Sequence, residues 1–369
     1  MQSLMTKTNY AAKLALADMI VCVGDQCERL GSYKHGCVKT TTLTCLFLGM
    51  MIGVACNRKH SPVVKWDHTF GGAQDDEARA VITTADGGFA FCGWTASSDS
   101  SKNDAWIVRL NKDGQRLWEK TYGDSADDEA TALAELKSGG FIVSGAKTVN
   151  GKADAWLIRL DPRGELLWEK NYGGKEFDKA ESFVVTADGD FIVCGGTRSQ
   201  GAGLLDAWIF RVDSTGNLLW EKTFGGEKFD RINSIITMPE GGFAVCGQTS
   251  SSGAGAVDFW LMRLDSQGQV LWDKVFGGAK NDWANAIAQT SDGGFLLCGI
   301  TESQGAGESE AWVLRLDAEG NLLWDKPMGG AQHENTYAIT ATSAGEYVFA
   351  GVTSSKGAGG KDGWVIKLK

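Results

Sequence analysis

One pattern occurs six times between residue 62 and the end of the chain, and it limits the possible folds more than any other feature. A leading tryptophan recurs at intervals of 52, 50, 52, 52 and 52 residues, and a second tryptophan follows each leading one. The leading set is Trp66, Trp118, Trp168, Trp220, Trp272 and Trp324, and the second set is Trp106, Trp156, Trp208, Trp260, Trp312 and Trp364. Short segments rich in aromatic and β-branched residues alternate with Gly and Asp, without helical periodicity. The sequence therefore predicts a tandem array of β-structured units.

Each unit is expected to hold four strands. In the first unit these span residues 78–84, 88–95, 104–110 and 115–122. Turns at Asp86-Gly87-Gly88 and Lys112-Asp113-Gly114 join them, because glycine supplies the positive φ of a tight hairpin. Four strands per unit are typical of a propeller blade, whereas a solenoid would need shorter repeats. We therefore expect an all-β fold, a six-bladed β-propeller of four-stranded blades.

The two ends of the array predict how the ring closes. The last unit ends after its third strand at 362–369, while residues 63–70 (VVKWDHTF) match the fourth-strand pattern LLWEKTF. We expect strand 63–70 to complete the last blade, because pairing the two ends protects two exposed sheet edges. One domain over residues 63–369 follows, although the length of 369 residues alone would suggest two.

These repeats resemble the Trp-rich repeat β-propellers of bacterial secreted proteins and lipoproteins, most of which have no assigned activity. The resemblance covers residues 63–369 and implies an exported propeller. The segment R-L-D-x-x-G-N-L-L-W-E-K is also distantly similar to the tryptophan-docking motif of quinoprotein-type propellers. Here the turn from Asp161 to Gly164 is one residue shorter than in that motif. The six-fold count is a second departure, so quinone binding is not carried over.

The first sixty residues follow a different plan. Residues 38–55 include a short apolar run after Lys39 that ends in small residues, as a secretory signal peptide does. Cys56 follows immediately, which predicts a lipoprotein whose mature chain begins at a lipidated Cys56, although Gly53 stands where such signals usually carry Leu. A plain signal peptide or a membrane anchor is the alternative. Residues 1–37 are interpreted as a start-site artefact, with Val38 as the true start, and residues 56–62 as a linker.

Charge and composition exclude several classes of protein. The chain has 36 basic and 46 acidic residues and a pI near 5.0, so binding to a nucleic-acid backbone is not expected. A hydrophobic share of 43% provides a large core and argues against wholesale disorder. The 49 glycines follow no G-X-Y period, which excludes collagen.

Residues present in every unit are interpreted as structural, because catalysis needs one asymmetric constellation rather than six copies. Both tryptophan sets and the Phe of D-G-G-F are assigned to packing, and Cys92, Cys194, Cys246 and Cys298 to buried free thiols. One acid precedes the first strand of each unit, and we call these six acids the acid ring. A second acid begins the third strand of each unit, and a basic residue lies within that third strand. We expect these acids to cap Gly-Gly turns or to pair with the bases, with cation binding at the channel mouth as the alternative. The acid ring is Asp76, Asp128, Asp178, Asp230, Asp282 and Glu334.

Residues that break the repeat are the candidates for function. They lie in the fourth-to-first and second-to-third connections or the strand ends beside them, which should share one face of the propeller. Ordinary drift between repeats is the alternative interpretation of these residues. For the two repeated tryptophan sets, the alternative to packing is an aromatic platform that binds sugars. The candidate ligand-binding residues are Trp94, Phe177, Arg198, Phe229, Trp283, Glu302 and His333.

No recognised enzyme motif is present: the sequence lacks H-E-x-x-H, G-x-S-x-G and the P-loop. We therefore predict no catalytic residue, cofactor or metal. The expected function is a lipid-anchored, monomeric binding or scaffold module for a protein or glycan at the bacterial cell envelope, in the outer membrane or periplasm. The alternative is a periplasmic or surface enzyme, such as a lyase, a glycosidase or a quinone-dependent oxidoreductase, acting through acids at the channel mouth.

Overall fold

The computed structural model describes residues 21–23, 26–28 and 66–369, apart from 99–101, 343–344 and 358. The chain divides into two compact units, Met1–Val63 and Val64–Lys369. In the first unit, β1 (Val21–Val23) and β2 (Gln26–Glu28) form an antiparallel hairpin. The predicted signal peptide, Cys56 and the linker to residue 62 lie outside the described residues. Within the described part of the chain, no helix is long and apolar enough to cross a membrane.

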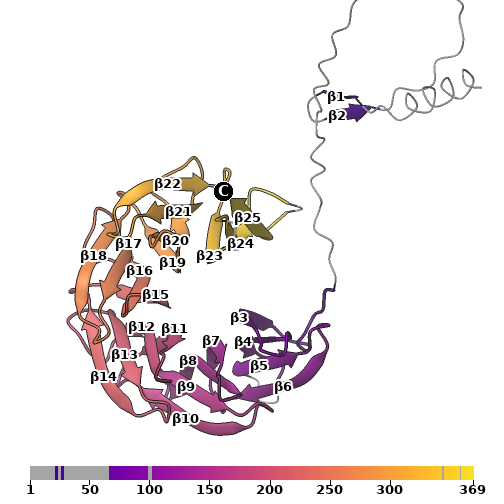
Figure 1. The fold of residues 1–369 in the computed structure, drawn as a ribbon, viewed down its shortest axis with the longest axis vertical. Helices are drawn as coiled ribbons and strands as arrows, with labels where there is room; N and C mark the ends of the chain where they lie inside the picture. The colour runs from indigo at the N-terminus through magenta and orange to yellow at the C-terminus, as the bar shows by residue number, and fades with distance from the viewer. Residues whose placement is uncertain (1–20, 24–25, 29–65, 99–101, 343–344, 358) are drawn as a thin grey trace, which may run out of the picture. The chain divides into compact units, whose positions relative to one another are not determined.

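The second unit is a six-bladed β-propeller (Figure 1). Each sheet is antiparallel and follows the chain order, and its first strand lies nearest the centre in Figure 1. The first three blades are β3 (Asp76–Thr83), β4 (Phe89–Thr95), β5 (Asp104–Leu110) and β6 (Arg116–Tyr122); β7 (Glu129–Glu135), β8 (Phe141–Val149), β9 (Lys152–Leu160) and β10 (Leu166–Tyr172); and β11 (Asp178–Val185), β12 (Phe191–Thr197), β13 (Asp206–Val212) and β14 (Leu218–Phe224). The last three are β15 (Asp230–Thr237), β16 (Phe243–Thr249), β17 (Asp258–Leu264) and β18 (Val270–Phe276); β19 (Asp282–Gln289), β20 (Phe295–Thr301), β21 (Glu310–Leu316) and β22 (Leu322–Met328); and β23 (Glu334–Ala341), β24 (Tyr347–Thr353) and β25 (Asp362–Leu368).

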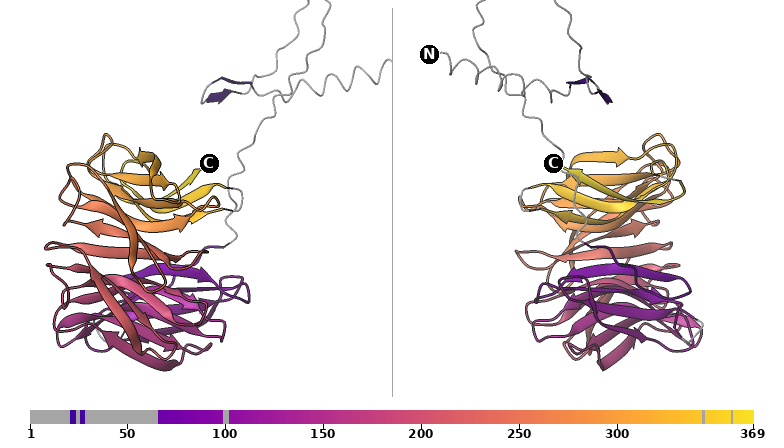
Figure 2. Two further views of the ribbon diagram at one scale, coloured as in Figure 1. Left: turned by 60° about the vertical axis from the view of Figure 1, so that its left-hand side comes forward. Right: turned by 90° about the vertical axis from the view of Figure 1, so that its right-hand side faces the viewer.

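The all-β, six-bladed architecture is as predicted, and the first-blade strands begin and end within two residues of their expected bounds. Seen edge-on, the strands cross the thickness of the ring, so the connections between them lie on its two faces (Figure 2). The predicted hairpin glycine Gly87 has a φ of 80°. The chain can therefore turn tightly on one face after each first strand and carry longer loops on the other.

Packing between neighbouring blades explains why the tryptophans repeat. Trp168 at the outer edge of the second blade lies against the turn at Gly216 of the third, where a Cβ would come within 3.1 Å of the indole ring. Trp208 is fully buried, and its indole N–H donates to Glu221 on the adjacent strand at 3.1 Å. The repeated thiols, such as Cys298, are buried and unbridged, as predicted, and burial raises the pKa of the Cys298 thiol to about 12.

The predicted ring closure by strand 63–70 is wrong in one respect. Residues 66–70 form no strand, and the last sheet keeps three strands, β23, β24 and β25. The expected side-chain packing is nevertheless present, because Trp66 lies edge-on to Phe89 at 5.6 Å and Phe70 packs on Phe91 at 5.4 Å. These aromatic contacts hold the segment on the first blade without any backbone pairing to β25.

The first and last blades consequently keep apolar side chains exposed where other blades bury them. Val81 of β3 is 69% exposed, whereas Ile235, at the same position of the fourth blade, is 4% exposed. On the last blade Val365 is 71% exposed, and its counterpart Leu261 is fully buried. Figure 1 shows β3 and β25 on either side of an open sector of the ring.

Candidate functional site

The long loops and the connections between blades share one face, as predicted. The backbone N–H of Arg198, which follows β12, donates to the carbonyl of Phe177, which precedes β11, at 2.8 Å. The same bond joins Ser250 to Phe229 in the next blade at 2.8 Å. We call this surface the loop face.

On the loop face, the acid ring is held by its own blades. Asp178 is fully buried and accepts hydrogen bonds from the backbone N–H of Gly174 at 2.8 Å, from the Ser199 hydroxyl at 2.6 Å and from the Thr197 hydroxyl. Asp230 and Asp282 repeat this arrangement. These bonds tie the connection between blades to the long loop. Cation binding by the ring remains a prediction.

The other repeated charges divide into two groups. On the loop face, the acid that begins the third strand accepts from the long loop, as Asp206 does from the N–H of Gly203 at 2.9 Å. On the opposite face, the third-strand base pairs with an acid of the first-to-second turn, as Arg109 does with Asp86 at 2.6 Å. The base therefore pairs with the turn acid.

The first strands bring a different and asymmetric set of side chains to the centre of the ring. Two positions on each first strand, two residues apart and so on the same side of it, change chemistry from blade to blade. The first position carries Glu77, Glu129, Lys179, Arg231, Trp283 and Asn335, and the second carries Arg79, Thr131, Glu181, Asn233, Asn285 and Tyr337. We call them the channel positions.

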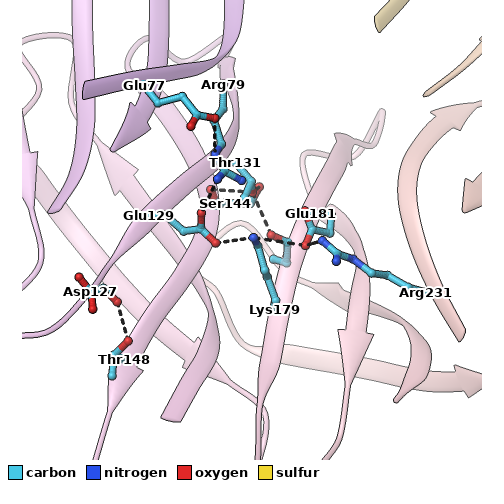
Figure 3. Close-up of polar contacts among 11 residues, drawn as sticks. Glu77, Arg79, Asp127, Glu129, Thr131, Ser144, Thr148, Lys179, Glu181 and Arg231 are labelled. Carbon is cyan, nitrogen blue, oxygen red and sulfur yellow. Dashed lines mark hydrogen bonds and ion pairs between the residues drawn. The ribbon is translucent and has the colours of Figure 1, made fainter. Parts of the chain in front are cut away.

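Ion pairs link the channel positions of the first four blades (Figure 3). Arg79 lies 3.2 Å from both Glu77 and Glu129, so it bridges the first and second blades. Lys179 contacts Glu129 and lies 3.5 Å from Glu181, and Arg231 completes the series by pairing with Glu181. The cluster is asymmetric, as an enzyme site would be, but each of its three carboxylates is bound to a cation. Among the described residues, none of the three lies beside a second unpaired carboxyl, the arrangement that glycoside hydrolysis by a carboxylate pair uses.

The remaining channel positions, apart from Thr131, line a pocket of about 500 Å³ next to this series. Trp283 and Tyr337 supply aromatic rings, and Tyr337 is 55% exposed. Asn285 donates to Asn335 at 2.9 Å and to a backbone carbonyl of the last blade, which fixes its amide. Arg231 and Glu181 also reach this pocket, so it joins aromatic, amide and charged groups in one volume.

Three of the candidate residues come together elsewhere on the loop face. The guanidinium of Arg198 lies over both the Phe177 ring, at 5.7 Å, and the Phe229 ring, at 5.8 Å. The two rings are 37% and 42% exposed, and Leu204 of the neighbouring long loop is 59% exposed. Leu205, next to Leu204, forms a backbone bridge with Phe229. We call Phe177, Arg198, Leu204 and Phe229 the aromatic–arginine cluster.

The other candidates lie apart from this cluster. Trp283 lines the channel pocket, whereas Trp94 is half-buried on β4, opposite Glu77 in the sheet register. Glu302 accepts a hydrogen bond from Asn281 at 2.8 Å. His333 lies 2.6 Å from Glu308 and 3.0 Å from the Ser309 hydroxyl. The predicted residues therefore belong to several places on the loop face.

Sequence reasoning overlooked part of the channel pocket. Asn285 and Tyr337 were not predicted, although their position differs in chemistry from blade to blade. Aligning the six units shows that signal, because neighbouring strand positions barely vary while this one changes in charge, size and polarity. Across the described residues there is no group of three or more His, Cys, Asp or Glu side chains arranged to hold a metal ion.

Comparison with known proteins identifies no family. No protein-family model matches the chain. The regulatory protein FlaEY of Caulobacter vibrioides is 27% identical over a segment covering 33% of this chain and only 14% of that protein. The WD40 domain of Neurospora crassa Pan2 is 12% identical with a TM-score of 0.46, covering 74% of each chain. Sqt1 of Chaetomium thermophilum is 14% identical with a TM-score of 0.48, covering 75% of this chain and 68% of that one.

Proposed function

We propose that this propeller is an exported, lipid-anchored binding module that recognises a glycan in the channel pocket. The observation that carries this proposal is the convergence, in one pocket of about 500 Å³, of residues that differ from blade to blade. Thr131, Asn233 and Asn285 share one structural role, since each donates to a backbone carbonyl of the next blade, but the charged and aromatic channel residues have no such role in common. Recognition of one ligand instead requires different groups at different points around it.

The chemistry of the pocket suits a sugar. Pyranose rings present C–H groups on their faces and hydroxyls around their edges, so they stack on aromatic rings and bond to planar polar groups. Trp283 and Tyr337 supply the rings. Arg231 supplies donors and Glu181 acceptors at the same pocket, and their mutual ion pair holds both in place.

Glycan binding is tested by screening the full chain on an array of bacterial surface polysaccharide fragments, followed by titration calorimetry. Replacing Trp283 by Ala is expected to weaken binding at least about tenfold, the factor that corresponds to ~1.4 kcal/mol. Phe177→Ala is the matched control, because it removes an exposed ring on the same face outside the pocket. Equal losses from the two variants, or no binding by the wild type, would remove this proposal.

The aromatic–arginine cluster supports a second candidate function, the recognition of a protein partner. Exposed aromatic rings with an arginine between them are the composition of protein-interaction hot spots. For this function Trp283→Ala becomes the control. The double variant Phe177→Ala, Phe229→Ala should abolish recovery of the partner by cross-linking, whereas Trp283→Ala should preserve it. A partner recovered equally with all variants would exclude this surface.

Export and lipid attachment have their own test. Metabolic labelling with palmitate in a bacterial host should label the wild type and not Cys56→Ala, and intact-mass analysis should give a mature chain beginning at Cys56. An unlabelled chain that retains residues 1–37 would contradict both the lipid anchor and the proposed start.

A further inference from the structure

The face opposite the loop face carries a cavity of about 1100 Å³ that spans the second, third and fourth blades. Its wall consists of first-to-second turns and the strand ends beside them, together with Ser214 and Ser266 of the third-to-fourth turns. Leu136, Val185, Phe191, Met238 and Phe243 give it an apolar lining. A volume of this size is ample for a small ligand.

One arginine in this cavity departs from the pattern of the other blades. In the other five blades the third-strand base pairs with an acid of its own first-to-second turn. The pairs are Arg109–Asp86, Arg211–Asp188, Arg263–Glu240, Arg315–Asp292 and Lys367–Glu346. In the second blade the turn reads Lys137-Ser138-Gly139-Gly140, and Ser138 occupies the place of the acid.

Arg159 therefore has only neutral partners in its turn. It donates to the Ser138 hydroxyl at 3.2 Å and to the carbonyl of Gly139 at 2.9 Å. Among the described residues no carboxylate forms an ion pair with Arg159, although Asp161 lies near it. Asp161 accepts from the N–H groups of Arg163 and Glu165 in its own turn, and most other blades repeat that acid.

The carboxylates around the cavity are held by partners other than Arg159. Arg211 pairs with both Asp188 and Asp190, and Glu135 accepts a hydrogen bond from the backbone of the first blade. Lys137 adds a second positive charge at the rim, and no acid is paired with it in the described part of the molecule. A half-buried guanidinium beside an apolar wall favours an anionic group attached to an apolar body.

We propose that this cavity is a second binding site, which takes a small amphipathic carboxylate with its head group on Arg159. The carboxylate replaces the turn acid that the second blade lacks, and its apolar body lies along the wall formed by Leu136, Met238 and Phe243. The site is separate from the channel pocket and shares no lining residue with it.

Equilibrium dialysis of the full chain with radiolabelled sodium octanoate tests the proposal, with 1-octanol as the uncharged match. Ser138→Asp restores the acid found in the first, third and fifth blades, so it should preserve the melting temperature and weaken octanoate binding about tenfold, or ~1.4 kcal/mol. Asn111→Asp adds the same charge on the same face, at a position where other blades carry Asp, and should change binding less than about twofold. Octanol should bind the wild type about tenfold more weakly than octanoate.

Three results would overturn the proposal: no octanoate bound to the wild type, equal binding of octanol and octanoate, or the same loss in Ser138→Asp and Asn111→Asp. None of these results bears on glycan binding in the channel pocket, so each proposal can be refuted without affecting the other.

Discussion

Asp258 offers a strong test of how charge is managed between blades. It begins β17, is fully buried and accepts hydrogen bonds from the backbone N–H groups of Gly255, at 2.9 Å, and Ala254. Among the described residues, its Oδ1 has no hydrogen-bond partner. Gly277 separates it from Asp282 of the next blade, since a Cβ there would lie 1.7 Å from Asp258 Oδ1 and 2.9 Å from Asp282 Oδ2. Burial, and then the negative charge of Asp282, raise the pKa of Asp258.

Asp258→Asn is expected to stabilise the protein at pH 7. The amide oxygen keeps the bond from Gly255, and the uncharged amide removes the repulsion between two buried carboxylates. Two like charges at close range repel each other by about 1 kcal/mol or more. The net gain in the free energy of unfolding is therefore about 1 kcal/mol.

The same reasoning fixes the pH dependence. Because the folded-state pKa of Asp258 lies above its ordinary value of 3.8, the folded protein binds this proton more tightly than the unfolded chain does. The contribution of this group to stability is therefore full below pH 3.8 and is lost as the pH rises through the folded-state pKa. Asp258→Asn lacks this loss, so its advantage over the wild type should grow from pH 4 to pH 7.

Urea unfolding in EDTA at both pH values measures the effect. Asp206→Asn is the control, because Asp206 accepts from Ala202 and Gly203 on separate oxygens and an amide must leave one of these donors unpaired. That variant should lose about 1–2 kcal/mol. An Asp258→Asn protein less stable than the wild type at pH 7 would refute the argument. Calcium that stabilises only the wild type would instead place a cation between the two acids.

The repeated contacts give three further predictions. Asp230→Ala should lower the free energy of unfolding, measured in urea, by about 3 kcal/mol, because it leaves buried hydrogen-bond donors unpaired. Asp76→Ala removes the same bonds from the more exposed first blade and should cost only about 1 kcal/mol. The hydrogen bond from Arg109 is the main cause that holds the pKa of Asp86 below 3.8. Asp86→Asn should therefore be less stable than the wild type at pH 7, and this difference should disappear as the pH falls through the folded-state pKa of Asp86. Gly216→Ala should cost at least about 1 kcal/mol in thermal unfolding, because its φ is 80° and its neighbour is a tryptophan ring.

The repeat made the blades predictable, and it also explains why ring closure was not. Strand positions and turns recur six times, so each is supported by several copies of the same pattern. The segment 66–70 occurs once at the edge of the array, and its pattern encodes two separable properties. Trp66 and Phe70 make the predicted contacts with the first blade, whereas pairing with β25 is a long-range interaction that a side-chain pattern does not specify.

The candidate site was also predictable only in part. Aligning repeats places a residue within its blade, and this was sufficient to select Phe177, Arg198 and Phe229, which meet because their blades are neighbours. The alignment does not say which side chains meet across the centre of the ring. Trp94 and Trp283 were selected together, yet only Trp283 lines the channel pocket.

The symmetry of the fold separates the positions that stabilise a blade from those free to bind a ligand. Asp178, Trp208 and their counterparts are bonded within their own blades, so replacing one breaks a contact that the fold needs. The channel positions and the turn residue Ser138 differ from blade to blade instead, although several channel residues also bond to the neighbouring blade. Their chemistry can change one blade at a time while the sheet is preserved, which lets a symmetric scaffold carry asymmetric sites. Three departures from the repeat, at the channel, the loop face and the opposite face, are therefore where selection for binding would act.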